Sequence, residues 1–197
     1  GVFEEATKDL LKVLDFSEKI NHFYMTPAGN QFLGHVYCEI GEYQTAMGHY
    51  DKAALFIEEN KLMPSWAKSN RIALTRAKVM NNEKDVDLES LYAYVSENKI
   101  KWFEGQMRRY IGEILLYLDG QYLSEAEHWI RKAIEADKGN GMMLDLGRDY
   151  ALYAELHKRK GDQPKAKENL AKAIDIFKEC GADGWVEKYA EEMASLS

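Results

Sequence analysis

Basic side chains carry the most specific chemistry in this sequence. Lys68, Arg71 and Lys78 are spaced i, i+3 and i+10, which places them on one face of a helix. An arginine can hold a carboxylate through two parallel N–H···O bonds, whereas a lysine acts as a compact point charge. These residue types at this spacing therefore suggest that a basic helical face recognises carboxylate groups.

Other reactive residue types do not combine into a site. The sequence has five histidines, His22, His35, His49, His128 and His157. They show neither an H-x-x-x-H pattern nor a Cys/His spacing suited to a metal, and His157 is interpreted as a core or interface residue. Cys38 is predicted to lie on a helix with no evident base beside it, which argues against a nucleophile. We therefore expect no enzymatic activity, no cofactor and no metal.

Composition and charge argue against two further classes of function, nucleic-acid binding and membrane association. The formal net charge of −7 argues against non-specific nucleic-acid binding, which relies on a basic surface. The longest nearly apolar run, residues 111–118, is too short to span a bilayer, so no membrane association is expected. Cys38 and Cys180 are far apart in sequence and form no disulfide framework, which favours a reducing, cytoplasmic location.

Small residues recur along the chain with a 40-residue step. One series is Ala6, Ala46, Ala126 and Ala166, and a second is Ala53, Ala93, Ala133 and Ala173. Larger residues lie between the two series at Leu10, Tyr50, Ile130 and Leu170. Within a unit the order is thus small, large, small at i, i+4 and i+7, which is one face of a helix. Such a seam lets two helices approach closely while a bulky side chain fills the space beside them.

The first full unit carries a recognisable pattern. Before its helical seam stand Leu33-Gly34, Tyr37, Gly41 and Tyr43. This arrangement resembles the tetratricopeptide repeat (TPR) consensus. Repeats of about 40 residues rather than the usual 34 resemble the longer TPR variants in the C-terminal arrays of bacterial and archaeal multidomain signalling proteins. The second unit departs most from the pattern, because Val86 and Ser90 replace the alanine and the large residue of the seam.

The pattern predicts an all-α fold: an α-solenoid of antiparallel helix pairs forming a right-handed TPR-like superhelix. We expect one array over residues 1–197, with units at about 1–23 (a half repeat), 24–62, 63–101, 102–141 and 142–181, and a capping helix at 183–197. The second helices of the pairs are expected at about 3–21, 43–60, 85–98, 124–137 and 163–180. The first helices are expected at about 27–40, 65–81, 104–118 and 143–160. Because no capping element precedes the first helix, we also expect further repeats upstream.

Turn residues agree with these boundaries. Thr26-Pro27 is predicted to be a helix N-cap followed by proline at the first helical position, and residues 124–127 a capping box. Gly41 and Gly161 are predicted to adopt the left-handed conformation that ends a helix. The stretch 139–141 is expected to be a helix–helix turn and not a phosphate-binding loop.

The resemblance also implies where a partner would bind. In TPR arrays the first helix of each pair lines a concave surface that binds partners. Carried over by register, the expected groove positions are Gln31, His35, Lys68, Arg71, Lys78, Arg108 and Arg148. We expect the cations among them to grip a peptide that is acidic or presents its C-terminal carboxylate. The alternative is a solvated face whose charges pair with nearby acidic residues such as Asp145 and Asp149.

The sequence thus predicts a protein–protein interaction scaffold that binds a partner peptide or domain in its groove, as a regulatory arm of a larger signalling protein. The alternative is an oligomerisation or intramolecular packing module of a multidomain ATPase, cyclase or transcription regulator, with no separate peptide ligand. A homo-oligomer is compatible with either hypothesis. A nucleic-acid partner is disfavoured, because only the basic groove positions would support it.

Overall fold

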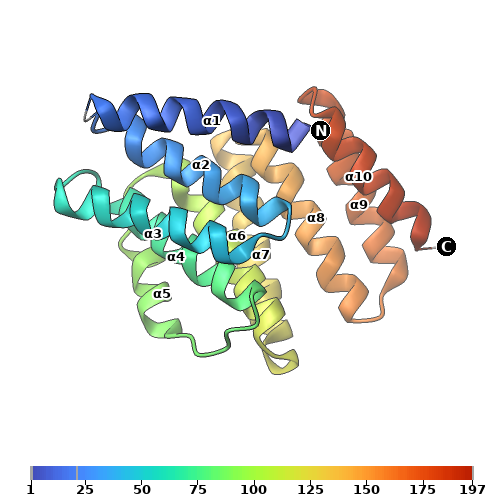
Figure 1. Ribbon diagram of the computed structural model, residues 1–197. Coiled ribbons are helices and arrows are strands. Elements are labelled where there is room, and N and C mark those ends of the chain that lie inside the picture. The colour runs from blue at the N-terminus through green and yellow to red at the C-terminus, as the bar shows by residue number, and fades with distance from the viewer. Residues whose placement is uncertain (1, 21, 197) are drawn as a thin grey trace. The chain divides into compact units, whose positions relative to one another are not determined.

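The chain folds into helices joined by short turns. The computed structural model describes residues 2–20 and 22–196, and every regular element in these ranges is helical (Figure 1). The chain divides into two compact units, Gly1–Lys99 and Ile100–Ser197, and each is described by itself.

The first unit contains five consecutive helices. They are α1 (Val2–Lys19), α2 (Met25–Glu39), α3 (Tyr43–Glu59), α4 (Pro64–Met80) and α5 (Leu88–Ser96). Each helix packs against the next one along the chain, and α1 to α4 form antiparallel neighbours (Figure 1). Because the connections are short, each helix packs against the helix that follows it in the sequence.

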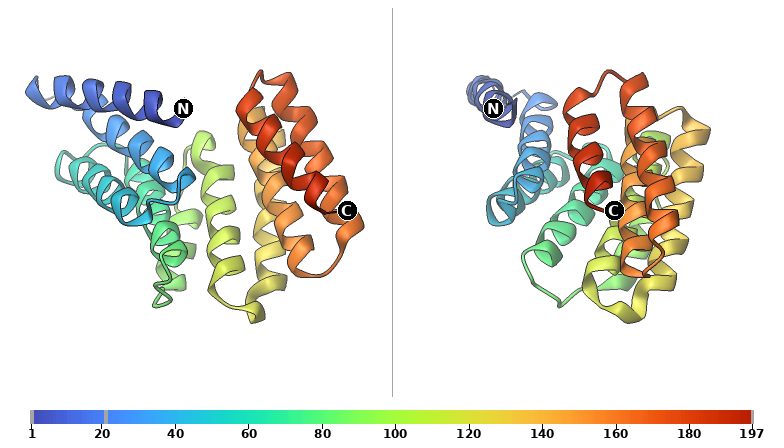
Figure 2. Two further views of the ribbon diagram at one scale, coloured as in Figure 1. Left: turned by 45° about the vertical axis from the view of Figure 1, so that its right-hand side comes forward. Right: turned by 90° about the vertical axis from the view of Figure 1, so that its right-hand side faces the viewer.

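The second unit repeats this arrangement with one additional turn. Its elements are α6 (Lys101–Leu118), the 3₁₀ turn η1 (Gly120–Tyr122), α7 (Leu123–Asn140), α8 (Met143–Arg159), α9 (Gln163–Glu179) and α10 (Asp183–Ser195). Here too consecutive helices pack on one another, and the views of Figure 2 show α6 to α9 as adjacent antiparallel rods. The predicted all-α, TPR-like architecture of helix pairs is therefore confirmed.

The predicted seam forms the core of three helix pairs. The small, large and small positions of α3, α7 and α9 are fully buried: Ala46, Tyr50 and Ala53; Ala126, Ile130 and Ala133; Ala166, Leu170 and Ala173. The close approach of α2 and α3 depends on Gly34, since a Cβ at this position would lie 2.7 Å from the Tyr50 ring. The small residues therefore set the helix spacing, as the sequence predicted.

The second predicted unit differs from the expectation. The helix predicted at 85–98 begins only at Leu88 and ends at Ser96, and Ala93 is exposed rather than part of a buried seam. The reason lies at its start, where the Asp87 carboxylate accepts hydrogen bonds from the Ser90 backbone N–H at 3.1 Å and the Ser90 hydroxyl at 2.6 Å. This cap begins the helix late and leaves it short, with only Leu91 buried among its residues.

Two predicted caps are also wrong. Helix α2 begins at Met25, so Thr26 lies inside it, and its hydroxyl is hydrogen-bonded to Ser17 of α1 across 3.2 Å. Ser124 does not cap α7, because α7 begins at Leu123, directly after the 3₁₀ turn that Asp119 caps.

The predicted helix ends are confirmed. Gly41 and Gly161 have φ of 81° and 76°, the left-handed region that glycine adopts without steric cost. The stretch 139–141 is the end of α7, where Gly141 is the left-handed C-cap.

The 3₁₀ turn shifts the helix register in the second unit. Gly112 packs against Ile130 and Ala126, as Gly34 packs against Tyr50. The sequence separation between Gly112 and its seam alanine, Ala126, is two residues longer than the separation between Gly34 and Ala46. Positions on α6 therefore correspond to those on α2 and α4 only after an offset of two residues.

Candidate peptide-binding surface

The structure distributes the predicted groove residues over both units. Gln31 and His35 lie on α2 and Lys68, Arg71 and Lys78 on α4, all within the first unit. In the second unit, Arg108 lies on α6 and Arg148 on α8.

Arg71 is held by two carboxylates of α3. Its Nε and Nη2 donate to the two oxygens of Glu58 at 3.0 and 2.7 Å, and its Nη1 donates to Asp51 at 2.6 Å. The hydrogen bonds from Arg71 lower the pKa of Glu58, and those that Glu58 accepts raise the pKa of Arg71. Arg71 is therefore paired with carboxylates of its own chain, which is the arrangement that the alternative interpretation of the basic face describes. Binding of a peptide carboxylate by Arg71 stays a prediction.

The two lysines of α4 differ in their surroundings. Lys68 forms an ion pair with Glu97, which follows α5, and the hydrogen bond from Lys68 lowers the pKa of Glu97. Lys78 is half-buried in the last turn of the helix, and no carboxylate of the described chain lies within ion-pair distance of it. Lys78 is therefore the α4 cation most open to an external anion.

Gln31 and His35 tie α2 to its neighbours. The Trp66 indole N–H donates to the side-chain oxygen of Gln31, which links α4 to α2. His35 Nδ1 lies 2.8 Å from the Tyr50 hydroxyl, which links α2 to α3, and its ring meets Phe32 edge-on with centroids 6.2 Å apart. Because Phe32 is half exposed, the polar face has an apolar edge on α2.

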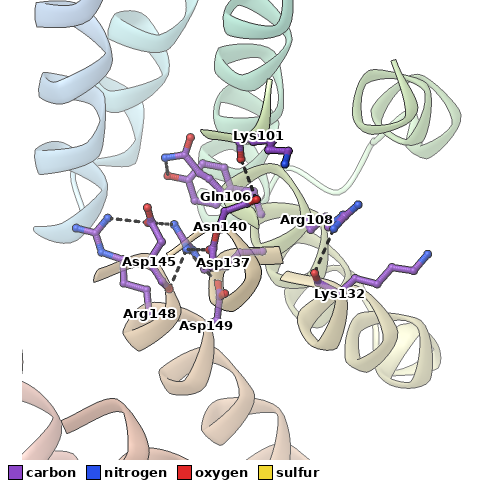
Figure 3. A network of polar contacts seen from close by, with 11 residues as sticks. Lys101, Gln106, Arg108, Lys132, Asp137, Asn140, Asp145, Arg148 and Asp149 are labelled. Atoms are coloured by element: carbon purple, nitrogen blue, oxygen red, sulfur yellow. Dashed lines mark hydrogen bonds and ion pairs between the residues drawn. The ribbon is translucent and has the colours of Figure 1, made fainter. Parts of the chain in front are cut away.

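The two arginines of the second unit also have internal partners (Figure 3). Arg108 pairs with Glu104 at 2.7 Å and donates to the backbone oxygen of Lys132 at 3.3 Å. Arg148 lies 3.5 Å from an oxygen of Asp145. Its guanidinium also lies over the Trp185 ring, 5.2 Å from the centroid.

The register offset bears on Arg108. With the offset of two residues, the α6 position equivalent to Lys68 of α4 is Gln106, and not Arg108. The placing of Arg108 in a groove remains a prediction.

A buried ionic cluster that sequence reasoning missed lies between α6, α7 and α8. Arg109 donates to Asp145 at 2.9 Å and to Asp149 at 3.1 Å, and lies 3.8 Å from Asp137. Figure 3 labels these three aspartates. Arg109, Asp137 and Asp149 are almost completely buried. The alternative interpretation paired Asp145 and Asp149 with basic residues of the face. Asp145 does contact Arg148, and both aspartates pair with the interior Arg109.

Asp137 and Asp149 form a carboxyl pair. Among the described residues, no N–H or hydroxyl donates to either oxygen of Asp137 or to Oδ2 of Asp149. Burial raises the pKa of Asp137 to about 6 and that of Asp149 well above its ordinary value. Both shifts favour the protonated carboxyl, which carries an O–H donor that the carboxylate lacks.

Asp137 lies at a register position with mixed chemistry. This position is occupied by Ile57 in α3 and Phe177 in α9, both fully buried, and by Ser17 and Glu97 in the other two units. Gly147 faces Phe177 and Gly105 faces Asp137, where a Cβ would lie 1.9 Å from the carboxylate oxygen. The sequence pattern did not single out this cluster, because the same register position is polar in two other units.

The remaining reactive residues do not assemble. His157 is buried against the Tyr153 ring, so the prediction of a core histidine is confirmed, and desolvation lowers its pKa. Cys38 is buried and Cys180 exposed, and neither forms a disulfide within the described residues. The described ranges hold no cluster of His, Cys, Asp and Glu able to bind a metal. None of their helices is long and apolar enough to cross a bilayer.

Three solved structures resemble the chain. The apo form of RapI has a TM-score of 0.66 and 19% sequence identity over 91% of this chain and 64% of that chain. BtubC (BKLC) from P. vanneervenii has a TM-score of 0.62 and 12% identity over 100% of this chain and 91% of its own. A crystal structure of nearly identical TPR-like repeats from a putative kinesin light chain of Podosopora anserina has a TM-score of 0.52 and 14% identity, over 91% and 89% of the two chains.

These comparisons concern the fold. No protein-family model matches the sequence, and no curated protein does. The structural neighbours are TPR-like helical-repeat proteins, and this chain spans less than two thirds of RapI. At such identities the likeness establishes a TPR-like α-solenoid and leaves the ligand to the chemistry of the surface.

Proposed function

We propose that this TPR-like chain is a non-catalytic protein-interaction scaffold whose α2–α4 face binds a carboxylate-bearing peptide segment. The observation that carries the proposal is the set of cations on α4, with Arg71 already in bidentate contact with a carboxylate and Lys78 without an ion pair in the described chain. On α2, the polar Gln31 is hydrogen-bonded to Trp66 of α4, and His35 contacts the exposed Phe32 ring. The proposal treats residues 1–197 as one array.

The internal ion pairs do not prevent such binding. Glu58 and Asp51, which hold Arg71, have side chains that are 43% and 48% exposed. Exposed pairs of this kind contribute only about 0–1 kcal/mol, because water and salt screen them. A peptide carboxylate could therefore replace Asp51, which holds Arg71 through one hydrogen bond, at little cost, and Lys78 would add an attraction that no internal residue offsets.

Support for the wider role is indirect. Helical-repeat folds present long surfaces to partners, which suits a regulatory arm of a larger signalling protein. Cys38 and Cys180 are free thiols in the described chain, which fits a reducing, cytoplasmic compartment. The alternative function is an oligomerisation or intramolecular packing module of a multidomain ATPase, cyclase or transcription regulator.

Charge reversal tests the proposal directly. Acidic peptides with free and with amidated C-termini, immobilised as an array, would be probed with wild-type protein and with Arg71→Glu and Lys78→Glu variants. We expect bound peptides to lose at least about tenfold in affinity on either reversal, and binding to weaken as salt is raised. Lys167→Glu on the exposed surface of α9 is the control and should bind as wild type does.

The other outcomes are equally informative. If bound peptides are insensitive to salt and to both reversals, the cationic-face proposal is wrong. If no peptide binds and the protein sediments as a concentration-dependent oligomer, the packing-module alternative is supported instead. Reversal of Arg108 and Arg148 tests whether the second unit takes part.

A further inference from the structure

The internal carboxylates contact the α4 cations in two different ways. Glu58 accepts hydrogen bonds from Nε and Nη2 of Arg71, so its two oxygens hold one edge of the guanidinium. Asp51 accepts a single hydrogen bond, from Nη1 of the same arginine. Glu97 likewise contacts Lys68 through one carboxylate oxygen. One of the three carboxylates is therefore bidentate and two are held through a single contact.

Arg71 keeps donors for a further carboxylate. A guanidinium carries five N–H groups in a planar fork. The hydrogen bonds to Glu58 and Asp51 leave one N–H of Nη1 and one N–H of Nη2. These two groups form the second edge of the fork, which a carboxylate can also hold bidentately. Asp51 takes the other N–H of Nη1, so it lies beside the edge that an incoming carboxylate would use.

The two kinds of contact also differ in strength. Hydrogen bonding to Glu58 is the largest cause of the raised pKa of Arg71, ahead of hydrogen bonding to Asp51. The side chains of Asp51 and Glu97 are 48% and 60% exposed, so water and salt screen their single contacts. Asp51 and Glu97 are therefore the partners that the α4 cations can exchange most easily.

We propose that Asp51 and Glu97 are internal competitors of the acidic peptide, and that Glu58 is a positioning residue that orients Arg71 towards it. This inference rests on the proposed function of the basic α4 face. On binding, ligand carboxylates displace Asp51 from Arg71 and Glu97 from Lys68, while the bidentate contact of Glu58 remains.

The competitors also define the class of ligand. Lys68 and Arg71 are three residues apart on α4, which makes them neighbours on the helix surface. A ligand with one carboxylate exchanges one exposed contact for another and gains little. A segment with several carboxylates displaces both competitors together and also reaches Lys78. The face therefore selects multiply acidic segments over singly charged ones.

Neutral variants of the internal carboxylates separate the two roles. The probe is a fluorescein-labelled peptide of six glutamates, and its affinity for the full chain is measured by fluorescence anisotropy. Asp51→Asn should tighten binding about two- to fivefold, because the ligand no longer displaces an internal carboxylate, and Glu97→Gln should act in the same direction. Glu58→Gln should instead weaken binding at least about threefold, because the guanidinium loses its bidentate support.

A matched control removes the same charge without the contact. Glu59→Gln alters the exposed neighbour of Glu58 on α3 and should change the affinity less than about twofold. A general charge effect would tighten binding in all four variants, whereas the proposal requires opposite signs for Asp51→Asn and Glu58→Gln. Far-UV circular dichroism checks that each variant is folded, and a peptide of six glutamines checks that binding depends on carboxylates.

The outcomes distinguish this inference from the proposed function. Unchanged affinity in Asp51→Asn, or tighter binding in Glu58→Gln, overturns the inference but leaves the basic-face proposal intact if Arg71→Glu still weakens binding. Equal binding of the peptide to wild type and Arg71→Glu, or no binding to wild type, overturns both.

Discussion

Protonation of Asp137 should make the second unit more stable as the pH falls. Its pKa is about 6 in the folded protein because burial disfavours the charged form, against an ordinary value of 3.8. A raised folded pKa contributes stability that is fully present below the unfolded pKa and is lost as the pH rises through the folded one. Each pKa unit corresponds to about 1.4 kcal/mol, so the full effect is about 3 kcal/mol. Between about pH 7.5 and about pH 4.5 the expected gain is about 2 kcal/mol.

Asp137→Asn isolates this contribution. The amide cannot ionise and can still donate a hydrogen bond to Asp149, so the variant should lack the acid stabilisation. Urea unfolding followed by tryptophan fluorescence reports mainly on the second unit, which holds Trp102, Trp129 and Trp185. The free energy of unfolding of wild type relative to the variant should rise by about 2 kcal/mol as the pH falls from about 7.5 to about 4.5.

The comparison with the variant matters because other carboxylates act in the opposite sense. Glu58 has a lowered pKa, so its contribution is present above its unfolded pKa and is lost in acid. Such terms cancel when wild type and variant are measured at the same pH. Asp175→Asn on the exposed side of α9 is the control and should run parallel to wild type. Parallel profiles for wild type and Asp137→Asn would refute the reasoning.

The remaining predictions concern packing, charge and capping, each measured by urea unfolding. Gly34→Ala should destabilise the protein by about 1–3 kcal/mol, because its Cβ would lie 2.7 Å from the Tyr50 ring; Gly48→Ala, with open space around it in α3, should instead stabilise by about 0.5–1 kcal/mol. Arg109→Leu should cost about 3–5 kcal/mol, because it leaves buried carboxyls without their cation; a neutral result would show that the cluster is dispensable. Asp87→Ala should cost about 1 kcal/mol through loss of the α5 cap, and unchanged stability would contradict that role.

The sequence by itself determined the helices and their pairing. Alanine and large residues recurring every 40 positions can be buried together only on one helical face, so the seams of α3, α7 and α9 followed from spacing alone. Glycine at helix ends was equally readable, because left-handed backbone is costly for other residues. Both features are local or periodic in the sequence, so they can be recognised without the tertiary structure.

The tertiary structure decided how the polar groups are used. The sequence predicted that Arg71 binds a carboxylate of a partner peptide. In the structure Arg71 contacts Glu58, because α3 packs against α4. The 3₁₀ turn before α7 shifts the register of α6 by two residues, whereas the sequence prediction assumed a constant 40-residue step. No local sequence pattern predicts that Arg109 and Asp137 lie in one buried cluster. An ion inside a protein is tolerable only where several elements together supply its partners, and those elements meet only in the folded chain.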